Sequence, residues 1–284
     1  MSDTADAGAF PEWVQQTEDP MDERKAPRPL AVVTGASSGI GYHLALCAAE
    51  HGYDLIVAAD TPLNEAVLDF QSMGATVQAV QCDLATTEGV MHLVQAIGAR
   101  DVDALMANAG HGLGGSFLAQ DFGEVLHVIN TNITGTVHLV QHVARRMVAR
   151  AQGCILITGS IAGFQPGSFH AVYNGTKAFV DSFALALRNE LKGTEVTVSC
   201  LMPGATDTDF FERAGMETSK VATESSKLMQ PQDVARIGFH AMLKGEADVV
   251  AGWKNKVQVA FSKVMPAQAT AQIHRKLVEP KGQG

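Results

Sequence analysis

Tyr173 and Lys177, four residues apart, are the side chains in this 284-residue sequence best suited to move a proton. On a helix, residues at positions i and i+4 lie on one face, with their Cβ atoms about 5–6 Å apart. An isolated tyrosine, with a pKa of about 10, is a poor base at neutral pH, but a neighbouring ammonium group favours the phenolate and lowers that pKa. The pair indicates acid–base chemistry only where other parts of a site accompany it.

A glycine-rich turn is the second sign of chemistry. It follows a short apolar run and reads Thr34-Gly35-Ala36-Ser37-Ser38-Gly39-Ile40-Gly41. Glycines let the backbone turn tightly and approach a pyrophosphate, and the amino end of the following helix favours negative charge. The turn therefore predicts a dinucleotide site, with contacts from Gly35, Ser37, Ser38, Gly39, Ile40 and Gly41. A helix-capping loop is the alternative interpretation.

Asp60 follows a second apolar run and bears on which dinucleotide is bound. A carboxylate there can accept hydrogen bonds from the adenosine ribose hydroxyls and would repel a 2′-phosphate. No arginine or lysine occurs between Ala31 and Arg100, so this stretch offers no cation for NADP. We therefore expect NAD as the cofactor, with NADP less favoured. A solvated turn aspartate before Thr61-Pro62 is the alternative.

These residues fall at the ends of elements that alternate along the chain. The expected strands are residues 30–34, 54–59, 76–80, 104–107, 154–158, 196–201 and 248–250. The expected helices are residues 40–51, 63–73, 88–97, 124–150, 171–191 and 232–243. Continuous apolar strands between helices are typical of a parallel sheet covered on both faces. The predicted fold class is α/β, a Rossmann-like doubly wound parallel sheet of about seven strands.

We expect one dinucleotide-binding catalytic domain over residues 29–251. Residues 1–28 are rich in acidic residues and prolines, which predicts a disordered or loosely packed arm. Residues 252–284 are expected to form a C-terminal helical extension of the same domain. Three interpretations of its apolar and basic residues stay open: a cap over the substrate mouth, an amphipathic membrane-surface segment, or a helix pair packed on its own domain or a sister subunit.

Composition excludes several other classes of protein. With 46% hydrophobic and 18% charged residues, the chain is neither disordered nor collagen-like. A net charge of −9 argues against general affinity for nucleic acid or anionic lipid. The four scattered cysteines and the lack of CxxC or HExxH motifs predict no metal site. No run is long enough to span a membrane and no signal peptide is evident, so we expect a cytoplasmic protein.

Taken together, the motifs resemble those of the short-chain dehydrogenase/reductase family, in its branch with TGxxxGxG and YxxxK motifs. Thr34, Gly35, Gly39 and Gly41 spell the first motif, and Ser160 precedes Tyr173 by thirteen residues, as the family's serine does. Asn132, in Thr131-Asn132-Ile133-Thr134-Gly135, matches the family's helix asparagine. The resemblance covers residues 30–250.

The resemblance also assigns cofactor contacts beyond the glycine turn. Asp83 and the adjoining Leu84 match the segment that meets the adenine ring, and Asp60 lies one place beyond the commonest aspartate position of NAD-binding members. Asn108, Ala109 and Gly110 match the family's NNAG segment, with Ala107 replacing its first asparagine. Residues placed against the nicotinamide are Pro203, Gly204, Thr206 and Thr208.

The mechanism that the resemblance implies is hydride transfer between nicotinamide and a ketone or secondary alcohol. Tyr173 is the general acid or base, and Ser160 hydrogen-bonds the substrate oxygen. Lys177 lowers the Tyr173 pKa and holds the nicotinamide ribose, while Asn132 holds a water beside it. Residues 206–227 are expected to form a lid, whose phenylalanines suggest a partly apolar small-molecule substrate. His111 and His170 are weaker candidates for substrate binding.

Two alternatives to an NAD-dependent oxidoreductase stay open. One is an NADP-dependent carbonyl or 3-oxoacyl reductase, and the other is a non-catalytic nucleotide-binding redox sensor. Because family members usually associate, we expect a homodimer or homotetramer, formed through the helices predicted over residues 124–150 and 171–191.

Overall fold

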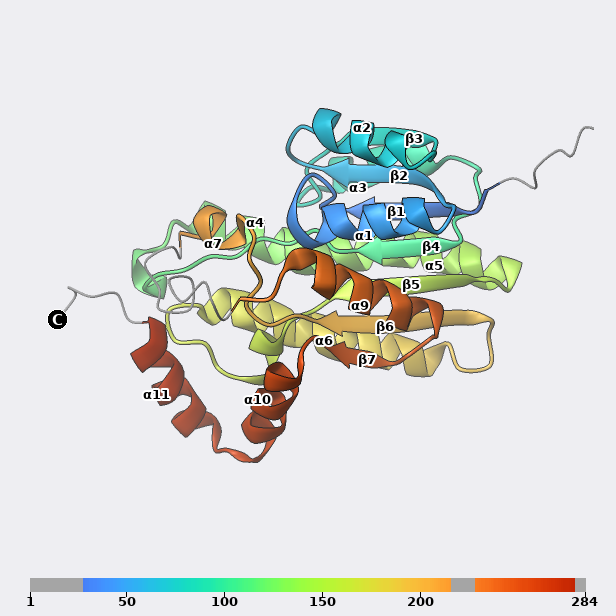
Figure 1. Ribbon diagram of the computed structural model, residues 1–284. Coiled ribbons are helices and arrows are strands. Elements are labelled where there is room, and N and C mark those ends of the chain that lie inside the picture. The colour runs from blue at the N-terminus through green and yellow to red at the C-terminus, as the bar shows by residue number, and fades with distance from the viewer. Residues whose placement is uncertain (1–27, 216–227, 279–284) are drawn as a thin grey trace, which may run out of the picture.

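The computed structural model describes residues 28–215 and 228–278 (Figure 1). The arm expected over residues 1–28 therefore lies outside the described residues, apart from Arg28. Its guanidinium donates to the backbone carbonyls of Gly52, Gly74 and Tyr53, and so ties the start of the domain to the turns around it.

The sheet has seven parallel strands in the order β3-β2-β1-β4-β5-β6-β7. Its strands are β1 (Leu30–Thr34), β2 (Asp54–Ala59), β3 (Val77–Gln81), β4 (Ala104–Ala107), β5 (Gly153–Thr158), β6 (Val196–Met202) and β7 (Asp248–Val250). The predicted doubly wound parallel fold is confirmed.

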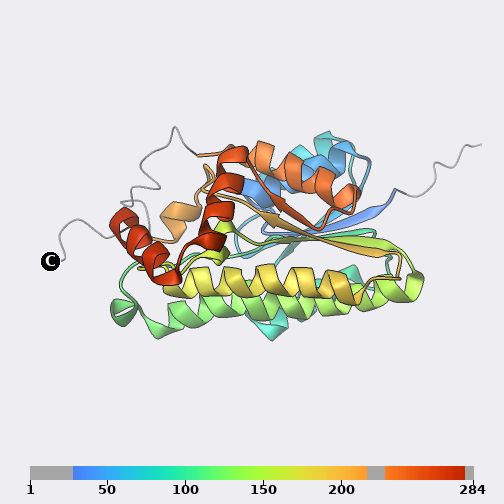
Figure 2. The ribbon, with the colours of Figure 1, turned by 90° about the horizontal axis from the view of Figure 1, so that it is seen from below.

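Helices cover both faces of the sheet (Figures 1 and 2). One face carries α1 (Gly39–Glu50), α2 (Asn64–Ser72) and α9 (Pro231–Leu243). The other carries α3 (Thr87–Ile97), α5 (Thr136–Arg150) and α6 (Ala171–Glu190). Neighbouring strand residues enter different cores: Val33 packs in the core under α1, α2 and α9, and Val32 packs in the core under α3, α5 and α6. This alternation explains why the strands are apolar throughout, because each face needs its own buried residues.

The order of the strands determines where a ligand can bind. The chain leaves β1 toward β2 on one side and later returns to place β4 on the other side of β1. The loops after β1 and β4 therefore diverge at the carboxyl edge and leave a crevice between them, as in other open parallel sheets.

The long helix predicted over residues 124–150 is interrupted at residues 130–135. It consists of α4 (Phe122–Ile129), a π-helical turn (Asn130–Gly135) and α5. Gly135 is needed there, because a Cβ on it would collide with the carbonyl oxygen of Leu84. The wider turn places Asn132 in the interior, where its side chain is buried.

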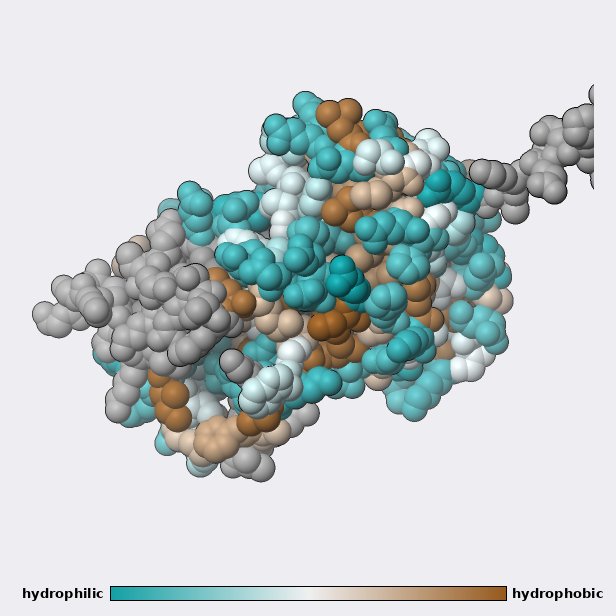
Figure 3. Space-filling model, viewed as in Figure 1, coloured by the Kyte–Doolittle hydropathy of each residue, from teal (hydrophilic) through white to brown (hydrophobic). Residues whose placement is uncertain are grey.

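The described chain also contains α7 (Phe210–Arg213), α10 (Trp253–Val264), α11 (Ala267–Val278) and two 3-10 turns, at Phe117–Ala119 and Ile161–Phe164. Helices α10 and α11 lie beyond the carboxyl edge of the sheet, where Figure 3 shows hydrophobic side chains gathered on the surface. Helix α11 forms hydrogen bonds with Ser168: Ser168 Oγ donates to the Ala271 carbonyl at 3.1 Å, and His274 Nδ1 lies 3.1 Å from the Ser168 carbonyl oxygen. In the described part of the chain, no helix has the length and apolar character needed to cross a membrane.

Candidate active site

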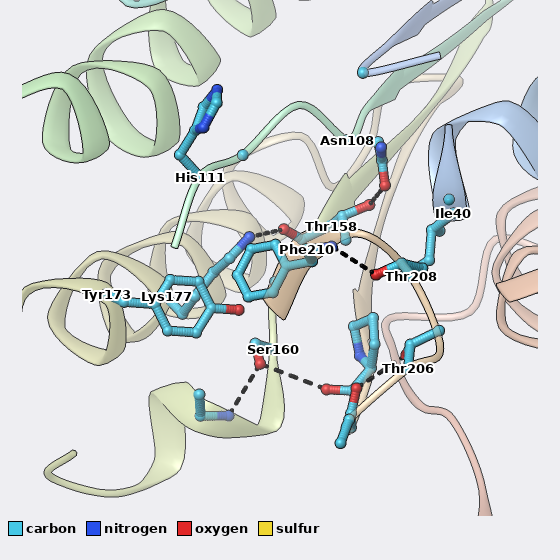
Figure 4. A pocket seen from close by; sticks show the side chains of 18 of the residues that line it. Ile40, Asn108, His111, Thr158, Ser160, Tyr173, Lys177, Thr206, Thr208 and Phe210 are labelled. Atoms are coloured by element: carbon cyan, nitrogen blue, oxygen red, sulfur yellow. Dashed lines mark hydrogen bonds between the residues drawn. The ribbon is translucent and has the colours of Figure 1, made fainter. Parts of the chain in front are cut away.

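A cleft of about 890 Å³ lies along the carboxyl edge of the sheet (Figure 4). Its walls come from the segments that follow each of the strands β1 to β6. Volumes of this size are usual for ligand sites. The predicted residues that line the cleft are Gly35, Ser37, Ser38, Gly39, Ile40, Asp60, Asp83, Leu84, Asn108, Ala109, Gly110, Ser160, Tyr173, Lys177, Pro203, Gly204, Thr206 and Thr208.

The glycine-rich turn fits the phosphate role predicted for it. Gly35 and Gly39 have φ angles of +66° and +58°, which side chains other than hydrogen disfavour. Gly41 lies behind the cleft wall, where a Cβ would collide with the carbonyl oxygen of Gly35. The turn thus packs close to helix α1 and presents the amino end of that helix to the cleft, a cradle suited to a pyrophosphate.

Asn108 fixes the turn to the centre of the sheet. Its Nδ2 donates to the Thr34 carbonyl at 3.2 Å, and its Oδ1 accepts from Thr158 Oγ1 at 3.1 Å. The Asn108 backbone N–H donates to Thr34 Oγ1 as well. One side chain thereby joins the ends of β1, β4 and β5, and Ala107 in place of asparagine leaves these bonds intact.

Asp60 lies at the end of the cleft far from α6. It interacts there with residues that are distant from it in the sequence. Asp60 Oδ2 lies 3.1 Å from His111 Nε2, and this hydrogen bond is the main reason that the pKa of Asp60 is lowered. The charge of Arg213 lowers that pKa further, and Arg213 Nη2 donates to Ser38 Oγ at 3.3 Å. A cation is thus present near the adenosine end, supplied from α7.

The reacting end gathers Ser160, Tyr173 and Lys177 (Figure 4). Lys177 Nζ donates to the Thr158 carbonyl at 2.8 Å, which directs the ammonium across the end of β5. Burial raises the Tyr173 pKa to about 12, while a hydrogen bond with Ser160 opposes the rise. Burial also lowers the Lys177 pKa. Phe210 covers Tyr173, with ring centroids 5.3 Å apart.

Asn132 lies behind the cleft wall rather than on it. Its Oδ1 accepts from the His111 backbone N–H at 2.8 Å, and its Nδ2 donates to the His111 carbonyl and to Thr176 Oγ1, each at 2.9 Å. The asparagine therefore holds the β4 loop against helix α6. A Cβ on Gly110 would lie 3.2 Å from Asn132 Oδ1 and 3.5 Å from Lys177 Nζ, so both side chains lie beside that glycine.

Asp181, one helical turn beyond Lys177, is a buried carboxylate that the sequence analysis missed. Its Oδ1 accepts from the Ser160 backbone N–H at 3.1 Å, and a Cβ on either Gly159 or Gly163 would collide with the carboxylate. Burial raises its pKa to about 6, against the opposing effects of the Ser160 N–H and the Lys177 charge. The spacing Tyr173, Lys177, Asp181 on one helix face was the available signal.

The segment after β6 closes over the glycine-rich turn. Thr208 packs against Gly39, and the Gly114 backbone N–H donates to the Ala214 carbonyl at 3.0 Å. Thr206 Oγ1 donates to the Gly204 carbonyl. The predicted lid is therefore described over residues 206–215, and residues 216–227 lie outside the description.

The C-terminal helices also reach the cleft, since Trp253, Asn255, Gln258 and His274 line it. Asn255 packs so closely on Gly204 that a Cβ there would collide with it. His274 faces His170 with ring centroids 5.3 Å apart, and burial lowers the His170 pKa to about 4. This placement favours the interpretation as a cap. His111, by contrast, points away from Tyr173 and Lys177 (Figure 4).

Comparison with known proteins agrees with this geometry. Residues 29–219 match the family model of the short chain dehydrogenases. An uncharacterized oxidoreductase of Myxococcus xanthus is 32% identical over 242 residues, covering 83% of this chain and 92% of the relative. The chain belongs to the short chain dehydrogenase family. It is an NAD(P)-dependent oxidoreductase that acts on alcohol or carbonyl groups.

Solved structures show the same architecture with either nucleotide bound. A short-chain dehydrogenase from Sphingobium yanoikuyae in complex with NADPH is 26% identical, with a TM-score of 0.74, covering 84% of this chain and 97% of that one. A family member from Burkholderia phymatum in complex with NAD is 24% identical, with a TM-score of 0.75, covering 90% and 98%, and shares the fold.

The fit of Asp181 between two glycines gives a first prediction. Gly163→Ala should lower the free energy of unfolding by about 1–3 kcal/mol and reduce kcat, because the new methyl group pushes α6 away from the end of β5. Gly175→Ala is the control, since Gly175 lies on α6 itself with open space around it and alanine favours a helix. Urea unfolding should show Gly175→Ala at or above wild-type stability. Equal effects of the two changes would contradict the prediction.

The raised Asp181 pKa gives a second prediction, on pH dependence. Because the folded state holds the proton more tightly than the unfolded state, the stability contributed by Asp181 is full below pH about 4 and is lost as pH rises through about 6. Asp181→Asn keeps an oxygen for the Ser160 N–H and removes the titration. The stability of this variant relative to wild type should rise from pH 4 to pH 6 and then level off. A difference that stays constant across this range in urea titrations would contradict it.

Proposed function

We propose that the protein is an NAD-preferring oxidoreductase that interconverts a partly apolar ketone and its secondary alcohol. One observation carries the proposal: Tyr173, Ser160 and Lys177 converge at one end of a single cleft, and the glycine-rich turn with Asp60 forms the other end. The reacting groups and the nucleotide site are therefore spaced along one continuous groove.

Tyr173 and Ser160 would handle the substrate oxygen. Burial favours the protonated phenol, so in carbonyl reduction Tyr173 is ready to donate its proton to the forming alkoxide. In the reverse direction it must first lose that proton, which requires positive charge nearby. The Ser160 hydroxyl would accept or donate a hydrogen bond at the same oxygen, while its own position is fixed through the Ala162 N–H and the Asp181 carboxylate.

Lys177 supplies the positive charge that the chain itself contributes. Its ammonium is buried and retains donors beyond its bond to Thr158, so it can bind the hydroxyls of a nicotinamide ribose. When bound, the nicotinamide ring supplies or accepts the hydride, and its oxidised form adds a positive charge that lowers the Tyr173 pKa. Asn132 is the positioning residue that joins the β4 loop to this helix.

The preference for NAD rests on Asp60. Its Oδ2 is shared with His111, and the carboxylate keeps further lone pairs for the adenosine ribose hydroxyls. A 2′-phosphate would face this negative charge. Arg213 is the observation that favours the second candidate, an NADP-dependent carbonyl reductase, because its guanidinium lies beside Ser38 and could pair with the phosphate.

The walls around the reacting end favour an apolar group on the substrate. Phe210, which covers Tyr173, lines the cleft together with Met229 and Trp253, and burial keeps the His170 side chain in the lining neutral. Few charged groups would have to lose water for an apolar substrate to enter.

We also infer self-association through the outer face of α4, α5 and α6. Among the described residues, the large apolar side chains left exposed on these helices are Phe122, Leu126, Val148, Phe179 and Leu185. Helices α5 and α6 run side by side along that face (Figure 2), and a second copy packed on them could cover the exposed groups that they carry.

The catalytic assignment predicts the behaviour of Tyr173→Phe. This change removes only the hydroxyl, so turnover should fall by at least about a thousandfold while the Kd for NADH changes less than about threefold. Steady-state rates on a panel of ketones and fluorescence titration of NADH measure the two effects. Phe261→Tyr, which adds a hydroxyl to an exposed ring on α10 that does not line the cleft, is the control and should retain activity. An active Tyr173→Phe enzyme would make the assignment wrong.

The cofactor assignment predicts that wild type binds NADH more tightly than NADPH. Asp60→Asn should lower the ratio of the NADPH Kd to the NADH Kd by about tenfold or more, because it removes the charge that repels the 2′-phosphate of NADPH. Thermal-shift titrations with both nucleotides, alongside Arg213→Gln, provide the measurement. If wild type prefers NADPH and Arg213→Gln abolishes that preference, the second candidate replaces the first.

A further inference from the structure

Asp60, His111 and His127 form a cluster of metal-ligating side chains at the adenosine end of the cleft. One ligand atom from each lies within 4.8 Å of those of the other two. Asp60 Oδ2 and His111 Nε2 are 3.1 Å apart, and the rings of His111 and His127 meet edge to face with centroids 4.6 Å apart. The three residues come from the end of β2, the loop after β4 and helix α4, so the fold rather than local sequence assembles them.

These separations suit three ligands of one ion. Zinc binds imidazole nitrogen and carboxylate oxygen at about 2.0–2.2 Å, so two ligands of a tetrahedral ion lie about 3.3 Å apart. The Asp60–His111 distance is already close to this value, and the ligand atom of His127, within 4.8 Å of the other two, would have to move by at most about 1.5 Å. A side-chain rotation is enough for such a movement.

The backbone around the cluster is held in place by the catalytic framework. His111 is fixed at both its N–H and its carbonyl by Asn132, and His127 lies on α4 directly before the π-helical turn that carries Asn132. Asp60 follows the buried strand β2, with its side chain about one-third exposed. Little backbone ordering would therefore accompany binding of an ion, which favours affinity.

We propose that Asp60, His111 and His127 bind a Zn²⁺ ion, and that this ion and the adenosine ribose of NAD exclude each other. Two imidazoles and one carboxylate are ligands that zinc accepts, whereas Mg²⁺ and Ca²⁺ prefer oxygen ligands alone. Three protein ligands leave a fourth position for water. The ion would engage the Asp60 carboxylate that the proposed function assigns to the ribose hydroxyls. Zinc would then inhibit the enzyme in competition with NAD.

The zinc-binding part of this proposal does not depend on the proposed function, but the competition does. Isothermal titration calorimetry of the full-length nucleotide-free protein with Zn²⁺ measures the zinc affinity. The visible spectrum of bound Co²⁺ reports the ligand geometry. Repeating the titration with saturating NADH measures the competition. A titration of Zn²⁺ into NADH alone corrects for binding to the nucleotide.

His127→Gln is the diagnostic variant, because His127 is a ligand of the proposed ion and does not line the cleft. The matched control is His142→Gln, since His138 and His142 on α5 bring their Nε2 atoms within 3.2 Å and could chelate an ion of their own. Circular dichroism and NADH affinity without zinc should be the same for both variants and wild type.

We expect wild type and His142→Gln to bind an ion that NADH displaces. His127→Gln should bind this ion at least about tenfold more weakly, because loss of even an outer partner of a metal ligand costs that much. If His127→Gln binds zinc as wild type does, the site is wrong. If zinc binding depends on His127, and NADH binds without weakening it, then the proposed mutual exclusion of zinc and the ribose is wrong. If NADH does not bind at all, the proposed function fails and the zinc result still stands.

Discussion

The close approach of helix α6 to the end of β5 determines the geometry of the reacting end. Asp181 enters the turn after β5 because Gly159 and Gly163 have no side chains, and it accepts the Ser160 N–H. Lys177 donates to the Thr158 carbonyl one helical turn away. Tyr173 begins the same helix face. Proton donor, ammonium and hydroxyl are therefore positioned by one helix–strand contact, and a change in that contact would move all of them together.

The same contact explains a cost. Two buried ionisable groups, Lys177 and Asp181, lie on neighbouring turns. Burial lowers the pKa of Lys177 and raises the pKa of Asp181, so it favours the neutral form of each. The attraction between the two charges offsets part of the desolvation free energy of burying them, but not all of it. Active sites commonly keep such groups because their placement serves chemistry rather than stability. Here the carboxylate acts through the Ser160 backbone and the lysine faces the cleft directly.

Local patterns in the sequence predicted much of the fold, because strand apolarity and helix period are short-range signals. Four of the strands, for instance 54–59, begin and end as expected. The π-helical turn at Asn132 was not predicted, since it depends on Leu84 from a distant loop. Arg213, His127 and Asn255 were missed for the same reason: only the folded chain brings them to the cleft or its wall. Asp60 was correctly placed at a strand end, but its pairing with His111 could not be seen.

The contacts of α11 connect the C-terminal part of the chain to the loop that precedes helix α6. His274 and Ala271 hold the loop at Ser168, and Phe169 in that loop has a φ of +63° with Arg275 over its ring at 5.9 Å. Such a backbone angle is unfavourable for phenylalanine and persists only while its surroundings hold it. This loop leads directly into the helix of Tyr173. The contacts that α11 makes at the cleft and the strained residue before the Tyr173 helix therefore belong to one connected set, and a change in either would be felt by the other.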